Sequence, residues 1–356
     1  MFEVRRARPS DRGEILSLIQ DVFGSEAAVR AETLWSWQWE EDPRLVERGY
    51  QGVVVAWRGK IVATMATPPV GLFIRGKTVD AVWYVDALVH WRSVRKAIRE
   101  ARRSGQESQD LDLSKGLAGL IFNQPDHPDY QMGKHLTAPM LVAVYQSGAK
   151  DQPGTMSLSR LVSVKSWLAR HLGKPVGWTL GTLVDLFLPA IPRPRLPVRI
   201  LEGPFDARFD LLWKKALESH EAITLRSADL LNWRYRHHPE RQYLCLIQEQ
   251  GDVLEGYLVL AKIERHGQER GQILDVLARS DDPQVLRSLF AAALGWFRRQ
   301  GTLKVECYTG SGKVVSVLEA LRFKERLSEG KSMSVVIRPE LDADELYVTR
   351  GDGDGG

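Results

Sequence analysis

The sequence has 356 residues, 49 of them basic and 45 acidic, so that its formal net charge at pH 7 is only +4. This length suggests about two domains, each large enough to bury a core, and so small a net charge gives no support for a DNA partner. The two cysteines, Cys245 and Cys307, lie far apart and form neither a disulfide framework nor a zinc motif. We therefore expect a cytoplasmic protein without a metal site, since the N-terminus also lacks the pattern of a signal peptide.

The first half of the chain predicts a strand, a helix and an antiparallel meander. A strand over 2–7 precedes a helix capped by Ser10 or Asp11, whose apolar residues recur at spacings of three, four and seven. Two glycine-containing turns, at 58–60 and 75–77, separate strands of the meander. The strands are expected over 52–57, 61–67, 71–74 and 81–89.

A second helix follows the meander, with Val94, Ala97, Ile98 and Ala101 on its buried face. The polar stretch 104–116 leads to further strands, which are expected over 117–122 and 139–145.

A tryptophan-centred pattern, W-x-[WY]-x-x-x-P, occurs twice. Residues 37–43 align without a gap on residues 233–239, and the same offset places the strand that starts at Phe2 on the strand that starts at Val198. The second half repeats the order of strands and helices of the first, so one fold is used twice. We expect Trp37 and Trp233 to be largely buried at equivalent positions. The second half should contain strands over 198–201, 243–248, 254–263, 271–278, 303–308 and 333–337, and helices from 206 and over 283–299.

The segment between the halves differs from both in composition. Alternating prolines over 191–197 predict an extended, semi-rigid spacer. The apolar stretch 161–188 is too interrupted to span a membrane and predicts helices that pack across the two domains, with an interfacial or partner-binding segment as the alternative. The expected organisation is a first domain over 1–149, a helical and proline-rich spacer over 150–197, a second domain over 198–340 and a disordered tail over 341–356.

This order of elements, with its tryptophan-and-proline segment, resembles the GNAT superfamily of amine N-acyltransferases over both halves but not the spacer. The resemblance implies an α/β (α+β) fold of two tandem GNAT-like domains, each a mixed, mostly antiparallel sheet flanked by helices. In that family the fourth strand splays from the fifth, and the gap holds the thioester of acetyl-CoA. The fourth and fifth strands correspond to 84–89 and 119–122 in the first half and to 273–277 and 304–308 in the second.

The resemblance also implies catalytic residues in the first half. Tyr130 begins a Tyr-x-x-Gly segment, expected as a turn after the fifth strand, whose phenol protonates the leaving sulfur in the family, and Asn123 matches the family's asparagine. Packing beside the turn is the alternative role for Tyr130. Asp86 is the candidate base or substrate contact. Asp275 takes its place in the second half, where we favour a structural carboxylate beside a bulged strand.

The cofactor-binding motif is where the sequence departs from the family. The family holds the CoA pyrophosphate with a [QR]-x-x-G-x-[GA] loop, but the residues after Val89 read His-Trp-Arg-Ser-Val-Arg-Lys-Ala, without glycine. Leu88 and Val89 end the expected fourth strand, and the resemblance implies that they lie beside the donor. The cations that follow are candidates for the CoA phosphates, with a solvated surface as the alternative. In the second half Asp281 and Asp282 would repel a phosphate. The cations, called here the basic stripe, are Arg92, Arg95, Lys96 and Arg99.

These features favour an acyl-CoA-dependent N-acyltransferase that catalyses, if at all, in the first half. Acetyl-CoA or another acyl-CoA would be the donor, and a small-molecule, sugar or peptide amine the acceptor. One alternative is a catalytically inactive GNAT-like scaffold that binds a partner. Another is an aminoacyl-tRNA-dependent transferase of the tandem-domain peptidoglycan ligase type, whose basic stripe would contact RNA. The missing glycine loop favours the alternatives, whereas Asn123 with Tyr130 favours the enzyme.

Overall fold

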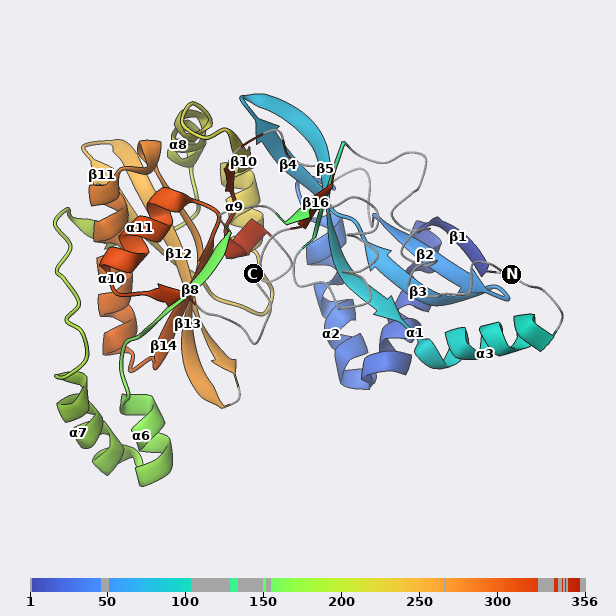
Figure 1. Cartoon of the computed structure of the whole chain (residues 1–356), viewed down its shortest axis with the longest axis horizontal. Helices are drawn as coiled ribbons and strands as arrows, with labels where there is room; N and C mark the ends of the chain where they lie inside the picture. Colours follow the sequence, from blue (N-terminus) through green and yellow to red (C-terminus); the bar gives the residue numbers. More distant parts are fainter. Residues whose placement is uncertain are drawn as a thin grey trace. The chain divides into compact units, whose positions relative to one another are not determined.

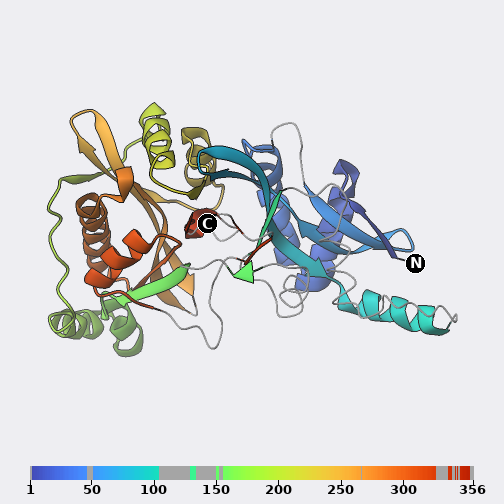
Figure 2. The same ribbon diagram turned by 45° about the horizontal axis from the view of Figure 1, so that its top comes forward.

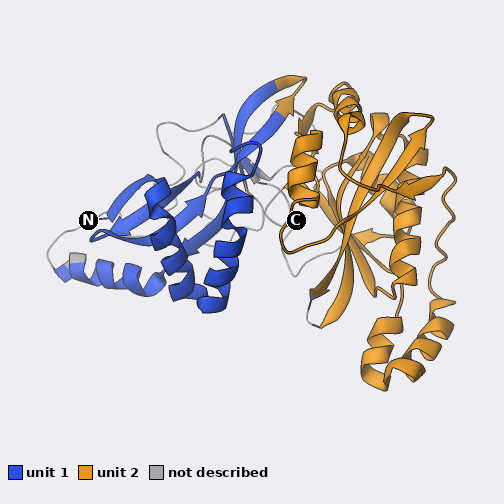
Figure 3. Cartoon of the chain, turned by 180° about the vertical axis from the view of Figure 1, so that it is seen from behind, with its two compact units in different colours: residues 1–72, 78–152, 335–342 blue, residues 73–77, 153–334, 343–356 orange. Residues whose placement is uncertain are grey.

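The computed structural model describes residues 2–45, 51–103, 129–133, 150–151, 155–265, 267–325, 336–338, 341, 343 and 345–352. The chain forms two compact units, which Figure 3 shows in separate colours. Unit 1 comprises Met1–Leu72, Thr78–Gln152 and Val335–Asp342. Unit 2 comprises Phe73–Lys77, Pro153–Ser334 and Ala343–Gly356.

The meander of the first half depends on two tight glycine turns. Arg58 and Gly59 have φ angles of 54° and 77°, and Arg75 and Gly76 have φ angles of 48° and 76°. Two successive positive φ angles define the two-residue type I′ hairpin turn, in which glycine avoids the strain of a side chain. Both turns predicted from the sequence are confirmed. The strands that they join are β2 (Gly52–Trp57) with β3 (Lys60–Ala66) and β4 (Pro69–Ile74) with β5 (Lys77–Val89).

The sheet of unit 1 is mixed. β1 (Phe2–Arg6), β2, β3 and the later part of β5 are antiparallel neighbours in that order. β6 (Tyr130–Gly133) runs parallel to β5. β16 (Val336–Arg338), expected in the second half, pairs instead with β6 and with β7 (Lys150–Asp151) in unit 1. The strands predicted over 117–122 and 139–145 lie outside the described residues.

Two helices cover strand β3 in unit 1 (Figure 1). α1 (Arg12–Phe23) buries Ile15 and Leu18, and α3 (Trp91–Arg103) buries Val94 and Ala97. Asp11 stands at the start of α1, but its carboxylate binds the Arg5 guanidinium at 2.6 and 2.9 Å instead of capping the helix. The other helical segments in the described part of this unit are η1 (Pro9–Asp11), α2 (Ser25–Trp35) and the π-helix η2 (Ser36–Glu40).

Unit 2 is built on a seven-stranded sheet of order β15-β8-β14-β13-β12-β11-β9. Among its described strands only β13 and β14 pair in parallel, from Arg270 opposite Lys304 to Ile273 opposite Cys307. This is the strand arrangement expected for a mixed, mostly antiparallel sheet. The strands are β8 (Met156–Leu161), β9 (Val198–Ile200), β11 (Leu244–Gln250), β12 (Val253–Arg265), β13 (Gln268–Ala278), β14 (Lys304–Thr309) and β15 (Lys324–Glu325).

The helices of unit 2 bury a continuous apolar core. α10 packs against β11, β12 and β13, and α8 packs against β12 and β13. The core includes the fully buried rings of Phe209, Phe290 and Phe297. The tip of the β4–β5 hairpin belongs to this unit, because Phe73 packs edge-on to Trp213 with ring centroids 4.7 Å apart. The helices are α8 (Ala207–Leu217), α9 (Ala228–Tyr235), α10 (Pro283–Arg299) and α11 (Gly312–Ala320).

Several boundaries differ from the sequence prediction. The predicted spacer over 150–197 contains β8, a strand of the second sheet between β14 and β15. Its middle forms α6 (Lys165–Leu172) and α7 (Lys174–Asp185), which lie side by side in Figures 1 and 2. The tail predicted to be disordered contains β17 (Leu346–Tyr347), parallel to β10 (Ala222–Thr224), and the buried η4 (Arg350–Asp352). Composition and periodicity indicate only local structure. Strand β8 and the ordered part of the tail were not predicted, because the residues that order them lie far away in the sequence.

Candidate functional site

A bulge near the end of β5 presents an exposed carboxylate in unit 1. The pairing of β5 with β3 skips Asp86 and Ala87, because Val85 lies opposite Ala66 and Leu88 opposite Thr64. Asp86 has a φ of 51°, a left-handed conformation that is uncommon outside glycine and fits a bulge. The bulge leaves the Asp86 side chain exposed, where its Oδ2 accepts a hydrogen bond of 3.0 Å from Gln38 Nε2.

The repeated tryptophan segment supplies Gln38. Its neighbour Trp39 is buried and lies 6.4 Å from the ring of Trp35, and this packing anchors η2. Trp37 is only half-buried, whereas Trp233 is buried, so the predicted burial is confirmed for Trp233 alone. Gln38 was not among the site residues expected from the sequence, although it stands between the two aromatic residues of the repeat.

The helix that follows β5 starts beside the bulge and carries the basic stripe. His90 N donates to Val62 O at 2.9 Å, and His90 Nδ1 lies 2.7 Å from Ser93 Oγ at the start of α3. Leu88 is buried and Val89 half-buried. All four stripe residues are exposed, on the side of α3 away from its buried residues. A helix N-terminus followed by exposed guanidinium and ammonium groups attracts anions.

Tyr130 does not lie beside Asp86. It is the first residue of β6 and pairs with Ala81, five residues before Asp86 on β5, which corresponds to roughly 16 Å along a strand. The Tyr-x-x-Gly segment is therefore a strand and not the predicted turn. By its parallel pairing it corresponds to β14 of unit 2 and takes the place of the fifth strand. The residues predicted for that strand, 119–122, and Asn123 lie outside the described residues.

The corresponding place in unit 2 holds a buried ionic network. The parallel pairing of β13 with β14 ends at Ile273, and the pairing of β13 with β12 skips Leu274, beside Asp275. Asp275 is fully buried and accepts hydrogen bonds from Arg226 Nε (3.1 Å), Tyr257 Oη (3.1 Å) and its neighbour Val276 N (2.9 Å). The structural role favoured for Asp275 is confirmed.

Arg226 joins this network to the C-terminal segment. Its buried Nη2 donates to Asp352 Oδ2 at 2.6 Å, and Thr349 Oγ1 donates to Asp275 Oδ1 at 3.1 Å. Burial alone would lower the pKa of Arg226, but Asp352 and Asp275 hold it well above its ordinary value. A Cβ on Gly351 would lie 2.0 Å from Tyr235 Oη, so the segment fits closely. Since η4 contacts both β13 and β14, the chain itself fills the place where these strands separate.

The N-terminus of the helix that follows β13 is already capped by a side chain of the chain itself. Asp282 caps α10, its Oδ1 accepting from Gln284 N at 2.7 Å and Val285 N at 3.4 Å. Asp281 is buried, and its burial raises the pKa of the carboxyl group to about 6. A phosphate would compete with the Asp282 carboxylate for the same N–H groups. This supports the expectation that unit 2 binds no CoA.

The fold of the chain is similar to that of several solved structures. No family model matches the sequence, and no curated protein matches it. Among solved structures, a GCN5-related N-acetyltransferase from Anabaena variabilis has a TM-score of 0.57 at 10% identity, covering 95% of this chain and 72% of that one. The chain has the GNAT fold. The fold class predicted from the sequence is thus confirmed.

Two further structures show the same fold. N-myristoyltransferase from Saccharomyces cerevisiae, solved with bound myristoyl-CoA, has a TM-score of 0.53 at 15% identity and covers 98% of this chain and 78% of that one. A GCN5-related N-acetyltransferase from Kribbella flavida has a TM-score of 0.52 at 12% identity, covering 94% of this chain and 71% of that one. The likeness extends over both units.

Proposed function

We propose that the protein is an acyl-CoA-dependent N-acyltransferase whose donor binds at the end of β5 in unit 1. The contrast between the two units carries this proposal. At the bulge, unit 1 keeps Asp86 exposed, whereas unit 2 buries Asp275 under its own C-terminal segment. At the following helix start, unit 1 presents the basic stripe, whereas unit 2 presents the capping carboxylate of Asp282. Of these two described sites, only the one in unit 1 combines an exposed acid with a cationic helix start.

The chemistry assigns a role to each part of this site. In acyl transfer the amine nitrogen attacks the thioester carbon, the carbon–sulfur bond breaks, and the amine proton leaves while the thiolate is protonated. Asp86, held by Gln38, is the proposed acceptor of the amine proton. The basic stripe would bind the CoA phosphates, and Leu88 and Val89 would border the acyl thioester. Tyr130, which pairs with Ala81 roughly 16 Å along the strand from Asp86, is too far from that carboxylate to protonate the sulfur of the same thioester, and a water molecule is the proposed proton source for the thiolate.

The donor is proposed as acetyl-CoA or a longer acyl-CoA. Two observations support the class: the GNAT fold, and the fact that one structure of this fold contains myristoyl-CoA. The acceptor is proposed as a small-molecule, sugar or peptide amine, because an amine nucleophile is what a carboxylate at the bulge would deprotonate. The acyl chain that is transferred distinguishes the N-acetyltransferases from the N-myristoyltransferase among the similar structures. The chain length that this protein prefers can be measured by titration with both kinds of acyl-CoA.

Calorimetric titration with acetyl-CoA and myristoyl-CoA tests the donor site. The wild-type protein should bind one of them saturably, and the double variant Arg95→Glu/Lys96→Glu should bind at least about tenfold more weakly, since each charge-assisted contact contributes about 1.5–3 kcal/mol. The matched control is Lys214→Glu/Lys215→Glu on α8, which makes the same charge change at exposed lysines of unit 2.

Three results would contradict the proposal in different ways. An unchanged dissociation constant in the α3 double variant would assign the basic stripe to the solvated surface. No heat at about millimolar ligand, far above typical substrate affinities, would favour the inactive scaffold. Salt-dependent tRNA binding that the same variant abolishes would favour an aminoacyl-tRNA donor.

A further inference from the structure

The α6–α7 hairpin of unit 2 exposes apolar side chains in unusual concentration. Of the sixteen large apolar side chains that are exposed in the described part of the chain, ten lie within residues 161–187. Trp167 and Trp178 are 40% and 41% exposed, and Leu186 and Phe187 after α7 are 75% and 89% exposed. Scattered apolar residues are normal on a protein surface, but a contiguous group marks an interaction site.

The hairpin does not need these side chains for its own packing. α7 buries only Gly177, Gly181 and Asp185, which recur every four residues along one side of the helix. A Cβ on Gly177 would lie 2.2 Å from the backbone of Ala169, so the two helices meet through glycine. Asp185 accepts hydrogen bonds from Ser163 Oγ at 2.7 Å and from Val164 N at 2.8 Å. Glycine contacts and buried polar bonds hold the hairpin, while most of α7 faces outward.

The charges around the hairpin are almost all positive. Residues 155–201, all of them described, include seven lysines and arginines but a single acid, the buried Asp185. Of the seven cations, Arg160 is buried and Arg199 is paired with Glu249 at 2.7 Å. Arg170 and Lys174 are exposed near the turn between the helices. On the neighbouring hairpin, Glu269 is paired with Lys262 at 3.2 Å. The apolar surface therefore lies within a cationic rim.

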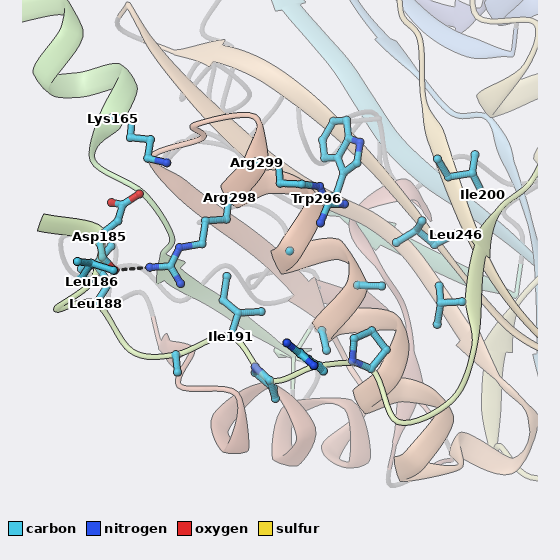
Figure 4. Close-up of a pocket in the computed structure, with 18 of the residues that line it drawn as sticks. Lys165, Asp185, Leu186, Leu188, Ile191, Ile200, Leu246, Trp296, Arg298 and Arg299 are labelled. Atoms are coloured by element: carbon cyan, nitrogen blue, oxygen red, sulfur yellow. Dashed lines mark hydrogen bonds between the residues drawn. The ribbon is translucent and has the colours of Figure 1, made fainter. Parts of the chain in front are cut away.

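A groove of about 980 Å³ beside the hairpin continues this surface (Figure 4). Leu186 and Leu188 line it together with Trp296 of α10. Its charged lining residues are Arg193, Arg199, Arg298, Arg299 and Lys165 against Asp185 alone. Arg298 donates to the backbone oxygen of Asp185 and so fixes the hairpin to α10. The groove repeats the combination of apolar residues and cations.

We propose that the α6–α7 hairpin, with Leu186 and Phe187, docks the protein onto an anionic phospholipid surface. Tryptophan and phenylalanine fit the boundary between headgroups and acyl chains, and the surrounding lysines and arginines match anionic headgroups. The helices have 8 and 12 residues, against about 20 for a membrane span. No helix in the described part of the chain is long and apolar enough to cross a membrane. The geometry therefore fits binding in the plane of the interface.

Vesicle flotation tests the proposal with the full chain. The wild-type protein should float with phosphatidylcholine vesicles that contain phosphatidylglycerol, and added salt should weaken the binding. Leu186→Ser/Phe187→Ser should lower the apparent affinity at least about tenfold, because two largely exposed apolar side chains are lost from the interface. Phe23→Ser/Leu211→Ser, which removes one exposed Phe and one exposed Leu elsewhere, should float like the wild type.

Other outcomes would overturn the docking proposal. These are no flotation of the wild type, equal flotation with pure phosphatidylcholine, or an unchanged affinity of Leu186→Ser/Phe187→Ser. A wild-type dimer that this variant converts to a monomer, without lipid binding, would show instead that a second copy covers the hairpin. Acyl-CoA affinity should be the same in wild type and variant, so the docking proposal and the donor-site proposal fail separately.

Discussion

Replacing Asp352 with asparagine removes the charge that holds the C-terminal segment in unit 2. Asp352 Oδ2 accepts from Arg226 Nη2 at 2.6 Å and from Thr349 N at 2.7 Å, and Oδ1 accepts from Thr224 Oγ1 at 2.6 Å. An amide of the same shape keeps one acceptor oxygen. It offers no negative charge to the buried guanidinium.

The expected loss follows from the burial of Arg226. Its side chain has no exposed surface, and that of Asp352 is 2% exposed. Removing one partner of such a pair typically costs about 3–5 kcal/mol, because the remaining charge stays out of water. Asp275 still accepts from Arg226 Nε at 3.1 Å. We therefore expect the lower end of that range, about 3 kcal/mol, for Asp352→Asn.

Calorimetric unfolding of the full chain measures this loss, which should fall on the transition of unit 2 if the two units unfold separately. Asp229→Asn, at an exposed position of α9, is the matched control and should stay within about 0.5 kcal/mol of the wild type. A loss below about 1 kcal/mol for Asp352→Asn, no larger than an average substitution, would refute the view that this ion pair holds the segment in place.

Three further predictions concern a buried acid, the candidate proton donor and the hairpin. Burial raises the pKa of Asp281 from 3.8 to about 6, so the folded state retains the proton longer and loses stability as the pH rises through that window. Relative to Asp281→Asn, the wild type should lose about 3 kcal/mol of unfolding free energy between pH 3 and 8 in urea titrations, and an equal pH dependence would count against a raised pKa. Tyr130→Phe should leave both CoA affinity and the turnover of an amine close to the wild type, because Tyr130 lies roughly 16 Å along the strand from Asp86; turnover slowed at least about tenfold would show instead that the phenol is the proton donor. Gly177→Ala should destabilise unit 2 by about 1–3 kcal/mol in thermal unfolding, whereas Gly13→Ala, with open space around its Cβ, should not destabilise.

Local patterns were enough to predict much of the fold. Each predicted hairpin turn depends on a glycine at a positive φ angle, a requirement visible in the sequence as Arg-Gly between apolar runs. The tryptophan repeat located equivalent helices ahead of both meanders, and Asp275 was correctly favoured as structural. These features depend on residues close together in the chain.

Long-range pairing could not be predicted in the same way. β8, expected in the spacer, pairs with β14 of unit 2, and β16, expected in the second half, pairs with β6 of unit 1. The sequence of a short apolar strand does not specify which other strand it pairs with. The ordering of Asp352 depends on Arg226, more than a hundred residues earlier, so a tail rich in glycine and aspartate resembled disorder. The expected turn at Tyr130 became a strand because β5 pairs with it.

Hydrogen–deuterium exchange of the full chain, with and without a saturating concentration of whichever of acetyl-CoA and myristoyl-CoA binds, tests most directly whether unit 1 holds the donor. If the donor binds there, exchange should be slower over residues 84–99, at the end of β5 and the first turns of α3. Exchange should not change over residues 282–286, where Asp282 already caps α10. Slower exchange at the start of α10 with none at α3, or no change anywhere, would contradict a donor site in unit 1.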